Sequence, residues 1–399
     1  MPWGWPEWPC SGGASPKGEH NPMTGAMYAA VSGMKAHMNK LNVIGNNVAN
    51  VNTFGYKSAR ATFTESLYTS MRAGSNGSNT MGGINPAQLG YGANISTIDL
   101  DMSSKSYVPT GRAMDCAIGG DGFFFVGPKA DMNIADPTST DPATYNVKRP
   151  QDLLLTRVGD FKFDPDGYLT DGRGNVVYGF VTCANEADGT AVDTAGPALN
   201  KEKYTFTTQL VPIRLPMAAP APTDLDNDPA EGEAIFPGKD DTTGLNLYPA
   251  NFTTGKTITV ESISIDDTTG MVKGYNTATD SAVVIGYIPL AKVANPYGVT
   301  HDSGPYYRAG AGAGDCSVAF VGGVPDGVDP HLATGVTGDA PFISSTGDVV
   351  INTGGLEASG TDIATEFAEM ISTQRGYQAN TRIITVTDAM LEELVNIKR

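Results

Sequence analysis

The sequence predicts a mainly β protein with terminal α-helices: one helix near each end, paired as a coiled-coil stalk, with nested antiparallel β domains between them. Apolar residues recur at alternating spacings of four and three residues only near the two ends of the chain, which is the seam pattern of a coiled coil. Between the ends, short runs of alternating apolar and polar residues are separated by Gly and Asp, as in strands joined by tight turns. The composition agrees, because 48 Gly, 26 Pro and only 17% charged residues favour turn-rich β structure.

The first predicted helix lies within residues 23–51. Its seam has one gap, where Gly45 replaces an apolar residue. The apolar seam positions are Met27, Val31, Met34, Met38, Leu41 and Val48.

The second predicted helix lies within residues 361–399, with Thr361 as its expected N-cap. Its apolar or aromatic seam positions are Ile363, Phe367, Met370, Tyr377, Ile384, Leu391 and Val395. A single helix of this kind exposes its seam and is marginally stable in water, so we expect the two helices to pair and bury both seams. The alternative is two ordinary amphipathic helices packed on a globular body.

Asparagines are concentrated at the end of the first helix, in the stretch LNVIGNNVANVNTFGYKS. Asn39, Asn42, Asn46 and Asn50 have spacings that place them on one helix face. Uncharged amides there are suited to hydrogen bonding between close-packed copies of the chain, and a solvent-facing helix end is the alternative interpretation. The predicted linker that follows contains the turn-favouring residues Asn52, Thr53 and Gly55, and also Tyr56.

The middle of the chain predicts strands. Residues 156–180 alternate around Asp166-Gly167 and around the glycines at 172 and 174, and residues 118–127 and 257–293 continue the pattern. Crossover helices are missing, so a parallel α/β architecture is excluded.

These patterns predict a nested domain organisation. Residues 1–22 hold all three Trp and five Pro before any periodic pattern, and we interpret them as a leader that is not native, with Met23 as the natural start. Residues 23–51 and 361–399 form the helical assembly domain, residues 52–90 a linker, residues 91–183 with 282–360 an inner β domain, and residues 184–281 an inserted outer β domain.

Charge and apolar pattern exclude several functions. The formal charge is −17, most of it between residues 52 and 360, which argues against nucleic acid or an anionic membrane as partner. The sequence contains no apolar run near the ~20 residues that a membrane helix needs, so we expect no membrane insertion. A secretory signal pattern is also absent. The four cysteines form no metal-binding or disulfide pattern; they are Cys10, Cys116, Cys183 and Cys316.

Catalytic and cofactor motifs are not found. The four histidines share no motif, and the Gly-rich run GAGAGD at 310–315 lacks the spacing of a dinucleotide loop. Asp224, Asp226 and Asp228 have the spacing of an EF-hand start, but Pro229 stands where that loop needs glycine. We therefore expect no enzyme activity, no cofactor and no metal.

The helices and turns resemble a known family. The stretches GAMYAAVSGMKAHMNKLNVIGNNVANVNTFGYKSARATF, TGRAMDCAIGGDGFFFVG and TRVGDFKFDPDGYLTDGRGNVVYGF occur in that order, and the chain ends with a long helical stretch that begins LEASGTDIATEFAEM. Together they resemble the bacterial flagellar rod and hook proteins. Within that family, GGINPAQLGYG at 82–92 and IGYIPLAKVANPYGV at 285–299 are similar to the hook members.

The resemblance implies a structural subunit that is exported unfolded by the flagellar type III apparatus without a cleaved signal. It implies polymerisation into a short curved tube, the hook, which transmits torque as a universal joint between rod and filament. The implied partners are further copies of the chain, the hook cap protein, the distal rod and the hook–filament junction protein. A distal rod subunit is the first alternative, and a secreted β-rich adhesin or carbohydrate-active enzyme is a remote one.

Overall fold

A computed structural model describes residues 22–77, 82–128, 152–183, 205–206, 210–215, 217–218, 234–235, 260–276, 281–321, 343–344 and 349–397. The chain divides into two compact units, which we call the helical unit (within residues 1–46, 60–99 and 364–399) and the β unit (residues 47–59 and 100–363). The predicted leader, except for Pro22, and the aspartates at 224, 226 and 228 lie outside the described residues.

Two long helices confirm the predicted terminal helices. They are α1 (Pro22–Ala49) and α2 (Ile363–Ile397). Because α2 begins at Ile363, Thr361 is too far from the first turn to be its cap. The Thr361 hydroxyl is buried without a hydrogen-bond partner among the described residues, so the predicted cap was wrong.

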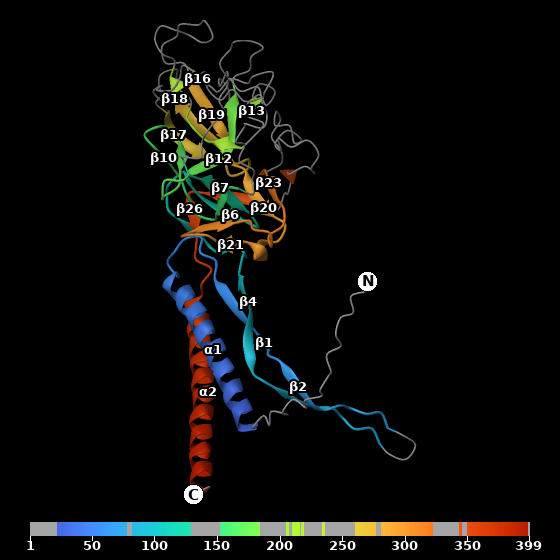
Figure 1. Cartoon of the computed structure of the whole chain (residues 1–399). Coiled ribbons are helices and arrows are strands. Elements are labelled where there is room, and N and C mark those ends of the chain that lie inside the picture. The colour runs from blue at the N-terminus through green and yellow to red at the C-terminus, as the bar shows by residue number, and fades with distance from the viewer. Residues whose placement is uncertain are drawn as a thin grey trace, which may run out of the picture. The chain divides into compact units, whose positions relative to one another are not determined.

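The helices run antiparallel and lie side by side within the helical unit (Figure 1). Lys40 Nζ in α1 lies 3.0 Å from Glu369 Oε2 in α2. Nearer the start of α1, His37 packs against Gly376. As the residue number increases along α1, from 37 to 40, the number of the contacting residue in α2 decreases, from 376 to 369. The helices are therefore antiparallel, and the prediction that the terminal helices pair is confirmed.

The helical unit also contains four strands. They are β1 (Ala59–Glu65), β2 (Tyr68–Arg72), β3 (Ala87–Gly90) and β4 (Ala93–Leu100). β1 pairs with β4, and β2 pairs antiparallel with β3. Residues 52–90, expected to be a linker, therefore contain three strands in their described part, and residues 50–58 form a connection with turns after α1. The linker interpretation missed them because paired two-stranded ribbons that expose both faces show little apolar alternation.

A 15-stranded sheet dominates the β unit, in agreement with the predicted β architecture. Its main path, in order, is β17 (Val260–Ile265), β18 (Met271–Asn276), β19 (Ser281–Tyr287), β12 (Val176–Cys183), β7 (Phe123–Gly127), β20 (Leu290–Val293), β23 (Cys316–Ala319) and β24 (Ile343–Ser344). The pairings along this path are antiparallel except for β23 with β24, which is parallel.

Shorter strands pair beside this path or in small separate sheets. Those beside the path are β8 (Leu154–Thr156), β10 (Lys162–Phe163), β11 (Leu169–Thr170), β13 (Thr205–Phe206), β14 (Val211–Pro212), β21 (Thr300–His301) and β22 (Tyr306–Arg308). The small sheets comprise β6 (Asp115–Gly119) with β9 (Gly159–Asp160) and β25 (Val350–Thr353), β5 (Tyr107–Pro109) with β26 (Gly355–Glu357), and β15 (Met217–Ala218) with β16 (Ala234–Ile235). A short 3₁₀ helix, η4, spans Pro296–Gly298.

Two predicted turns are present. Gly167 and Gly174 have φ angles of 82° and 89°, which only glycine adopts readily. These angles allow the chain to reverse between β10 and β11 and again before β12.

The core of the β unit lies on both faces of β7. Phe123 and Phe125 belong to one buried cluster, whereas Phe124 and Val126 belong to the other. A strand covered on both faces has a continuous apolar sequence, which explains the run FFFV. Burying each such side chain contributes roughly 1.5–3 kcal/mol.

The predicted outer domain, residues 184–281, is largely outside the described residues. Its strands β17 and β18 continue the main sheet through β19 to β12, so this part of residues 184–281 shares a sheet with the inner β domain.

Candidate functional site

Several close contacts of the helix pair are made by residues beside the predicted seam positions. The Lys40–Glu369 ion pair has side chains 22% and 46% exposed, and a Cβ added at Gly33 would lie 2.9 Å from Asn380 Nδ2. Several of the predicted seam residues are exposed, among them Met38 at 48%, Phe367 at 48% and Val395 at 67%. Others, such as Met370, Tyr377 and Ile384, are half-buried, so within one chain the pairing covers the two seams only in part.

Small and polar residues allow α1 and α2 to pack closely at these contacts. Gly33 and Gly376 have no side chains, so the facing side chains Asn380 and His37 lie directly against the opposite backbone. The most buried residues of α2 are Thr373 and Thr387, and Thr373 Oγ1 donates to the Glu369 carbonyl at 2.7 Å. Because these hydroxyls bond within their own helix, a polar stripe can be buried without unsatisfied donors.

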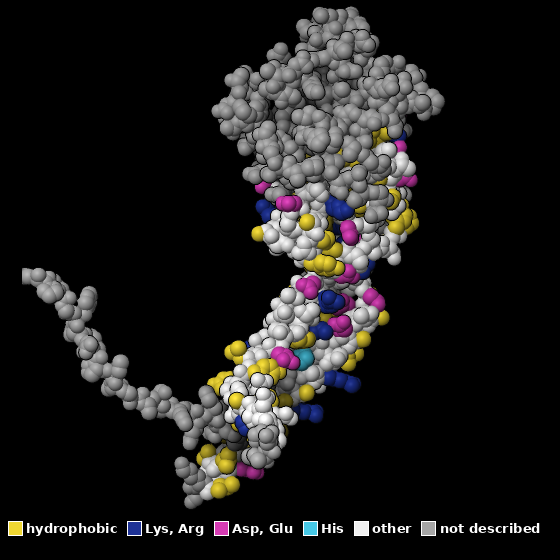
Figure 2. Space-filling model, turned by 90° about the vertical axis from the view of Figure 1, so that its right-hand side faces the viewer, with side chains coloured by type: hydrophobic (Ala, Val, Ile, Leu, Met, Phe, Trp, Pro, Cys, Tyr) yellow, Lys and Arg dark blue, Asp and Glu magenta, His cyan; other side chains and the backbone are white. Residues whose placement is uncertain are grey.

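Apolar residues of α2 are left exposed by this pairing. Five of them have the spacing of one helix face and form an apolar stripe with exposed fractions from 43% to 80%: Ile383, Val386, Met390, Leu394 and Ile397. The exposed apolar residues of α2 are Ile363, Phe367, Ile371, Ile383, Val386, Met390, Leu391, Leu394, Val395 and Ile397. Figure 2 shows yellow hydrophobic side chains on the surface of the helical unit. An exposed apolar stripe of this length indicates a site of protein interaction.

His37 lies at the centre of the helix contact. Its ring centroid is 5.4 Å from that of Phe63 in β1, and the Lys40 ammonium lies 5.9 Å from the Phe63 centroid. Burial lowers the pKa of His37, and the positive charge of Lys40 lowers it further. The His37 Nδ1 atom has no hydrogen-bond partner within the described part of the chain, so the site favours a neutral ring.

The predicted asparagine stripe is mainly exposed, and its neighbour Asn47 is the structural asparagine. Asn39, Asn42 and Asn46 are exposed, whereas Asn47 is 1% exposed. Asn47 donates Nδ2–H to the Ala59 carbonyl at 2.8 Å and accepts the Ala59 N–H at 3.0 Å. These two bonds join the end of α1 to Ala59 and close the turn between them. In the sequence, Asn47 has the helical spacing that places it on the same face as Lys40 and Ile44, which could have indicated that it is buried.

The connection at residues 50–58, which includes the first residues of the predicted linker 52–90, is held by specific hydrogen bonds. Tyr56 donates its hydroxyl to Asn47 Oδ1 at 3.1 Å, and Thr53 donates to Asn50 Oδ1 at 3.2 Å. Gly55 has φ of 67° and donates its N–H to the Glu357 carbonyl at 2.9 Å. Asn52 is exposed. This network holds the connection in one conformation.

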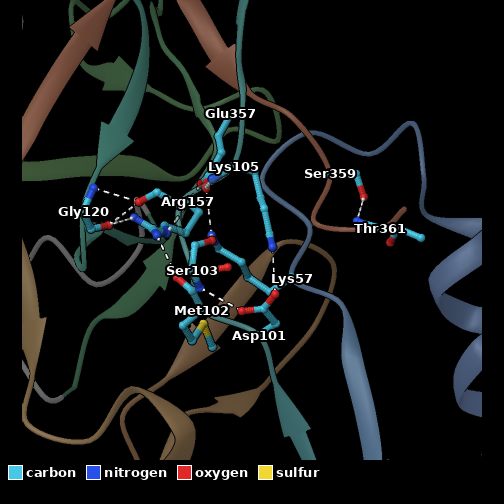
Figure 3. A network of polar contacts seen from close by, with 11 residues as sticks. Lys57, Asp101, Met102, Ser103, Lys105, Gly120, Arg157, Glu357, Ser359 and Thr361 are labelled. Carbon is cyan, nitrogen blue, oxygen red and sulfur yellow. Dashed lines mark hydrogen bonds and ion pairs between the residues drawn. The ribbon is translucent and has the colours of Figure 1, made fainter. Parts of the chain in front are cut away.

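Beside this turn lies a buried ion cluster of Lys57, Arg157 and Glu357 (Figure 3). Lys57 Nζ is 2.8 Å from Glu357 Oε1, with side-chain exposures of 0% and 2%. Lys57 Nζ also donates to the Ser103 carbonyl at 2.9 Å. Glu357 Oε1 accepts a second bond, from the Lys105 backbone N–H at 3.0 Å.

Arg157 connects the cluster to the sheet. Its two terminal nitrogens donate to the carbonyls of Gly120 at 2.9 Å and Met102 at 3.2 Å. Its Nε lies 3.6 Å from Glu357 Oε2, and neither atom has a hydrogen-bond partner among the described residues. The attraction between Arg157 and Glu357 is therefore ionic.

The cluster holds two cations and one anion away from water. Burial lowers the pKa of Lys57 to about 8, and the nearby Arg157 charge lowers it further, against the opposing effect of Glu357. Burial also lowers the pKa of Arg157 and raises that of Tyr307, to about 12. The ionised lysine is thus held at a cost.

Sequence reasoning missed this cluster. The available signal was a charged residue inside each of two short apolar runs, LLLTRVG and GGLEAS. Nothing in the sequence indicated that residues 57, 157 and 357 meet.

Metal and membrane features are not found in the described residues. No group of three or more metal-binding side chains occurs in these ranges, and none of their helices is long and apolar enough to cross a membrane. Cys116 and Cys316 are free and buried, and burial raises the pKa of each thiol to about 12, so neither is a reactive thiolate.

The terminal helices and the segments next to them match known family models. The model described as "Flagella basal body rod protein" matches residues 27–57, and "Flagellar basal body rod FlgEFG protein C-terminal" matches residues 352–397. These ranges contain most of α1 with its turn, and β26 with α2. They also contain Lys57 and Glu357.

Curated relatives extend the match along the chain. The flagellar basal-body rod protein FlgG of Bacillus subtilis is 29% identical over 377 residues, covering 94% of this chain and 100% of that protein. The flagellar hook protein FlgE of Borreliella burgdorferi is 25% identical over 465 residues, covering 94% and 100%. FlgE of Helicobacter mustelae is 33% identical over 186 residues, covering 45% and 37%.

Paired terminal helices and a β unit between them in sequence, together with these matches, resemble a flagellar axial type of protein. The chain is similar to flagellar rod and hook proteins over 94% of its length, and two family models of this group match segments near its ends.

Proposed function

We propose that this chain is a structural subunit of the bacterial flagellum that polymerises through its terminal helices into a tube. The observation that carries the proposal is the exposed apolar stripe of α2 in a chain that is similar to rod and hook proteins. In a single chain this stripe faces water, whereas neighbouring copies would bury it.

Assembly through this stripe has a sufficient driving force. Burial of apolar surface contributes roughly 25 cal/mol per Å², and ten large apolar side chains of α2 are at least 36% exposed. A stripe that contacts a different surface on the next copy makes a heterologous contact, which continues into a helical filament. The predicted seam residues of α1 and the exposed asparagines are proposed to line the same contacts.

Within the flagellum, we assign the subunit to the hook. The assignment is supported by the similarity of residues 82–92 and 285–299 to hook proteins and by the hook relatives that span 94% of the chain. In this role it is exported unfolded by the type III apparatus and forms a curved universal joint outside the envelope. Its partners are further copies, the hook cap protein, the distal rod and the hook–filament junction protein.

The distal rod is a second candidate that one observation favours. FlgG of Bacillus subtilis aligns in full over 377 residues, whereas FlgE of Borreliella burgdorferi needs 465 residues to cover the same share of this chain. The chain thus has the length of the rod relative.

Two experiments test the function and its location. The double variant Val386→Asp and Leu394→Asp places charges on the exposed stripe, so we expect loss of polymers in sedimentation with unchanged helix content. Thr385→Asp is the matched control, because Thr385 is exposed beside the stripe, and it should polymerise normally. Polymerisation of the double variant at the wild-type level would contradict the assembly proposal.

Immuno-electron microscopy of the native flagellum separates hook from rod. Label on the curved segment outside the envelope supports the hook. Label confined within the envelope supports the rod and contradicts the hook assignment.

A further inference from the structure

The chain passes between the two units at four places: after residues 46, 59, 99 and 363. On the β-unit side, the residues next to these places are 47–59, 100–106 and 355–363. We call these three stretches the crossing segments. Although they are far apart in sequence, direct hydrogen bonds join them within the β unit.

Main-chain bonds connect every pair of crossing segments. Gly360 donates its N–H to the Tyr56 carbonyl at 2.8 Å, and Asp101 donates to the Ser58 carbonyl at 2.8 Å. Ala358 donates to the Ser106 carbonyl at 2.9 Å. Ser359 Oγ adds a side-chain bond to the Asn50 carbonyl at 2.9 Å. The first, second and last crossing segments therefore form a closed set of contacts.

The ion cluster lies within this set of contacts. Lys57 belongs to the first crossing segment and Glu357 to the last. The second segment is bonded to both: its Ser103 carbonyl accepts from Lys57 Nζ, and its Lys105 N–H donates to Glu357 Oε1. Arg157 is the contribution of the sheet. Among the described side chains of the cluster, Glu357 is the one buried acid, since the Asp101 side chain is 46% exposed and Asp121 is exposed.

We propose that Glu357 is a latch that makes the three crossing segments open and close as one cooperative unit. When the last segment docks, its carboxylate compensates Lys57 and Arg157 together. When it is absent, two cations remain in a site closed to water, and an uncompensated buried charge is strongly destabilising. The first and second segments are therefore held in place only while the last one is docked.

The latch changes where this molecule can bend. A turn-rich linker at residues 50–58 would be a natural joint, but these residues are bonded on both sides to segments that the latch holds. Deformation is expected to leave the crossing segments together.

Hydrogen exchange of the full-length chain tests the latch. Glu357→Gln keeps the shape of the side chain and an acceptor for Lys57 but removes the charge. We expect the amides of Gly55, Asp101, Ala358 and Gly360 to exchange together, about 100-fold faster than in the wild type. The amide of Ile213, which bonds to the Val177 carbonyl in the sheet, should keep its rate.

Glu369→Gln is the matched control, because it removes the acid of the partly exposed Lys40 pair in the helical unit. It should leave these four amides unchanged. The latch is excluded if Asp101 keeps its rate while Gly55 and Gly360 accelerate, or if none of them accelerates.

A charge-compensating variant covers the case in which Glu357→Gln does not fold. Lys57→Met combined with Glu357→Gln removes one of the two uncompensated cations, so the double variant should fold and exchange more slowly than Glu357→Gln. A double variant that is no better protected than Glu357→Gln alone would overturn the charge-compensation argument.

Discussion

Lys57 places its ammonium in the interior of the β unit, where Glu357 and the Ser103 carbonyl bind it and Arg157 repels it. Its pKa falls from 10.5 to about 8. Between these two values the unfolded chain keeps the Lys57 proton and the folded chain has lost it. Stability therefore rises with pH across this window, and the contribution of this group is constant below it.

We predict that the free energy of unfolding of the wild type increases by up to about 3 kcal/mol between pH 8 and pH 10.5 through Lys57. Lys57→Met should remove that part of the increase, and urea unfolding at several pH values measures it. Lys40→Met removes a lysine that is 22% exposed and is the control. Equal pH profiles for wild type and Lys57→Met would show that the burial of Lys57 has no such effect.

Asn47 shows how a residue's role depends on one step of helix rotation. The sequence grouped Asn46 with an asparagine stripe, whereas the structure buries the next residue, Asn47, as the bridge to Ala59. Helical periodicity grouped asparagines on an exposed face and did not identify Asn47, which lies about 100° further round the helix, because its partner Ala59 is twelve residues away.

At the scale of elements, glycine determines how closely α1 and α2 pack. A Cβ at Gly376 would lie 2.8 Å from His37 Cε1 and 2.9 Å from Nε2, which is closer than carbon atoms pack. Gly45 lies in the same kind of helix interior, but a Cβ there meets nothing within 4 Å.

We predict opposite effects for two Gly→Ala substitutions. Gly45→Ala should stabilise the helices by roughly 0.5–1 kcal/mol, because alanine is the better helix former. Gly376→Ala gains the same propensity but displaces the His37 ring, so its net effect should be destabilising. Thermal melting followed by far-UV circular dichroism compares them. Stabilisation by both variants would show that the helix contact is not tight at Gly376.

The helix existence and pairing were predictable, and the contact face was not. Apolar spacing located both helices, since alternation of four and three residues is a local property. The face that α2 presents to α1 is polar and small, and its apolar stripe remains exposed. A hydrophobic pattern identifies a surface to be buried but does not say whether the same chain or another copy buries it.

At the scale of the whole molecule, the three residues of the ion cluster, Lys57, Arg157 and Glu357, all belong to the β unit and none lies in α2. Glu357 lies in β26, before the helix begins at Ile363. Deleting residues 364–399 removes the exposed apolar stripe but keeps the crossing segments.

We predict that this deletion abolishes polymerisation and leaves the β unit folded. Near-UV circular dichroism should retain the signal of the buried Tyr306 and Tyr307, with a cooperative thermal transition, while sedimentation shows no polymers. Polymers of the deletion variant would contradict the role of α2 in assembly. Loss of the tyrosine signal would show instead that the β unit depends on α2.

The sequence by itself determined the elements of this protein and their order: helices at both ends, turns at Gly167 and Gly174, the buried aromatic strand at residues 123–126, and its relationship to rod and hook proteins. Each depends on residues that are neighbours in the chain, so local periodicity and turn chemistry suffice. The tertiary structure alone decided that Lys57, Arg157 and Glu357 share one buried site and that Gly33 and Gly376 form the helix contact. These contacts join residues that are 100 or more positions apart, and their energies come from desolvation and close packing, which exist only after the chain has folded.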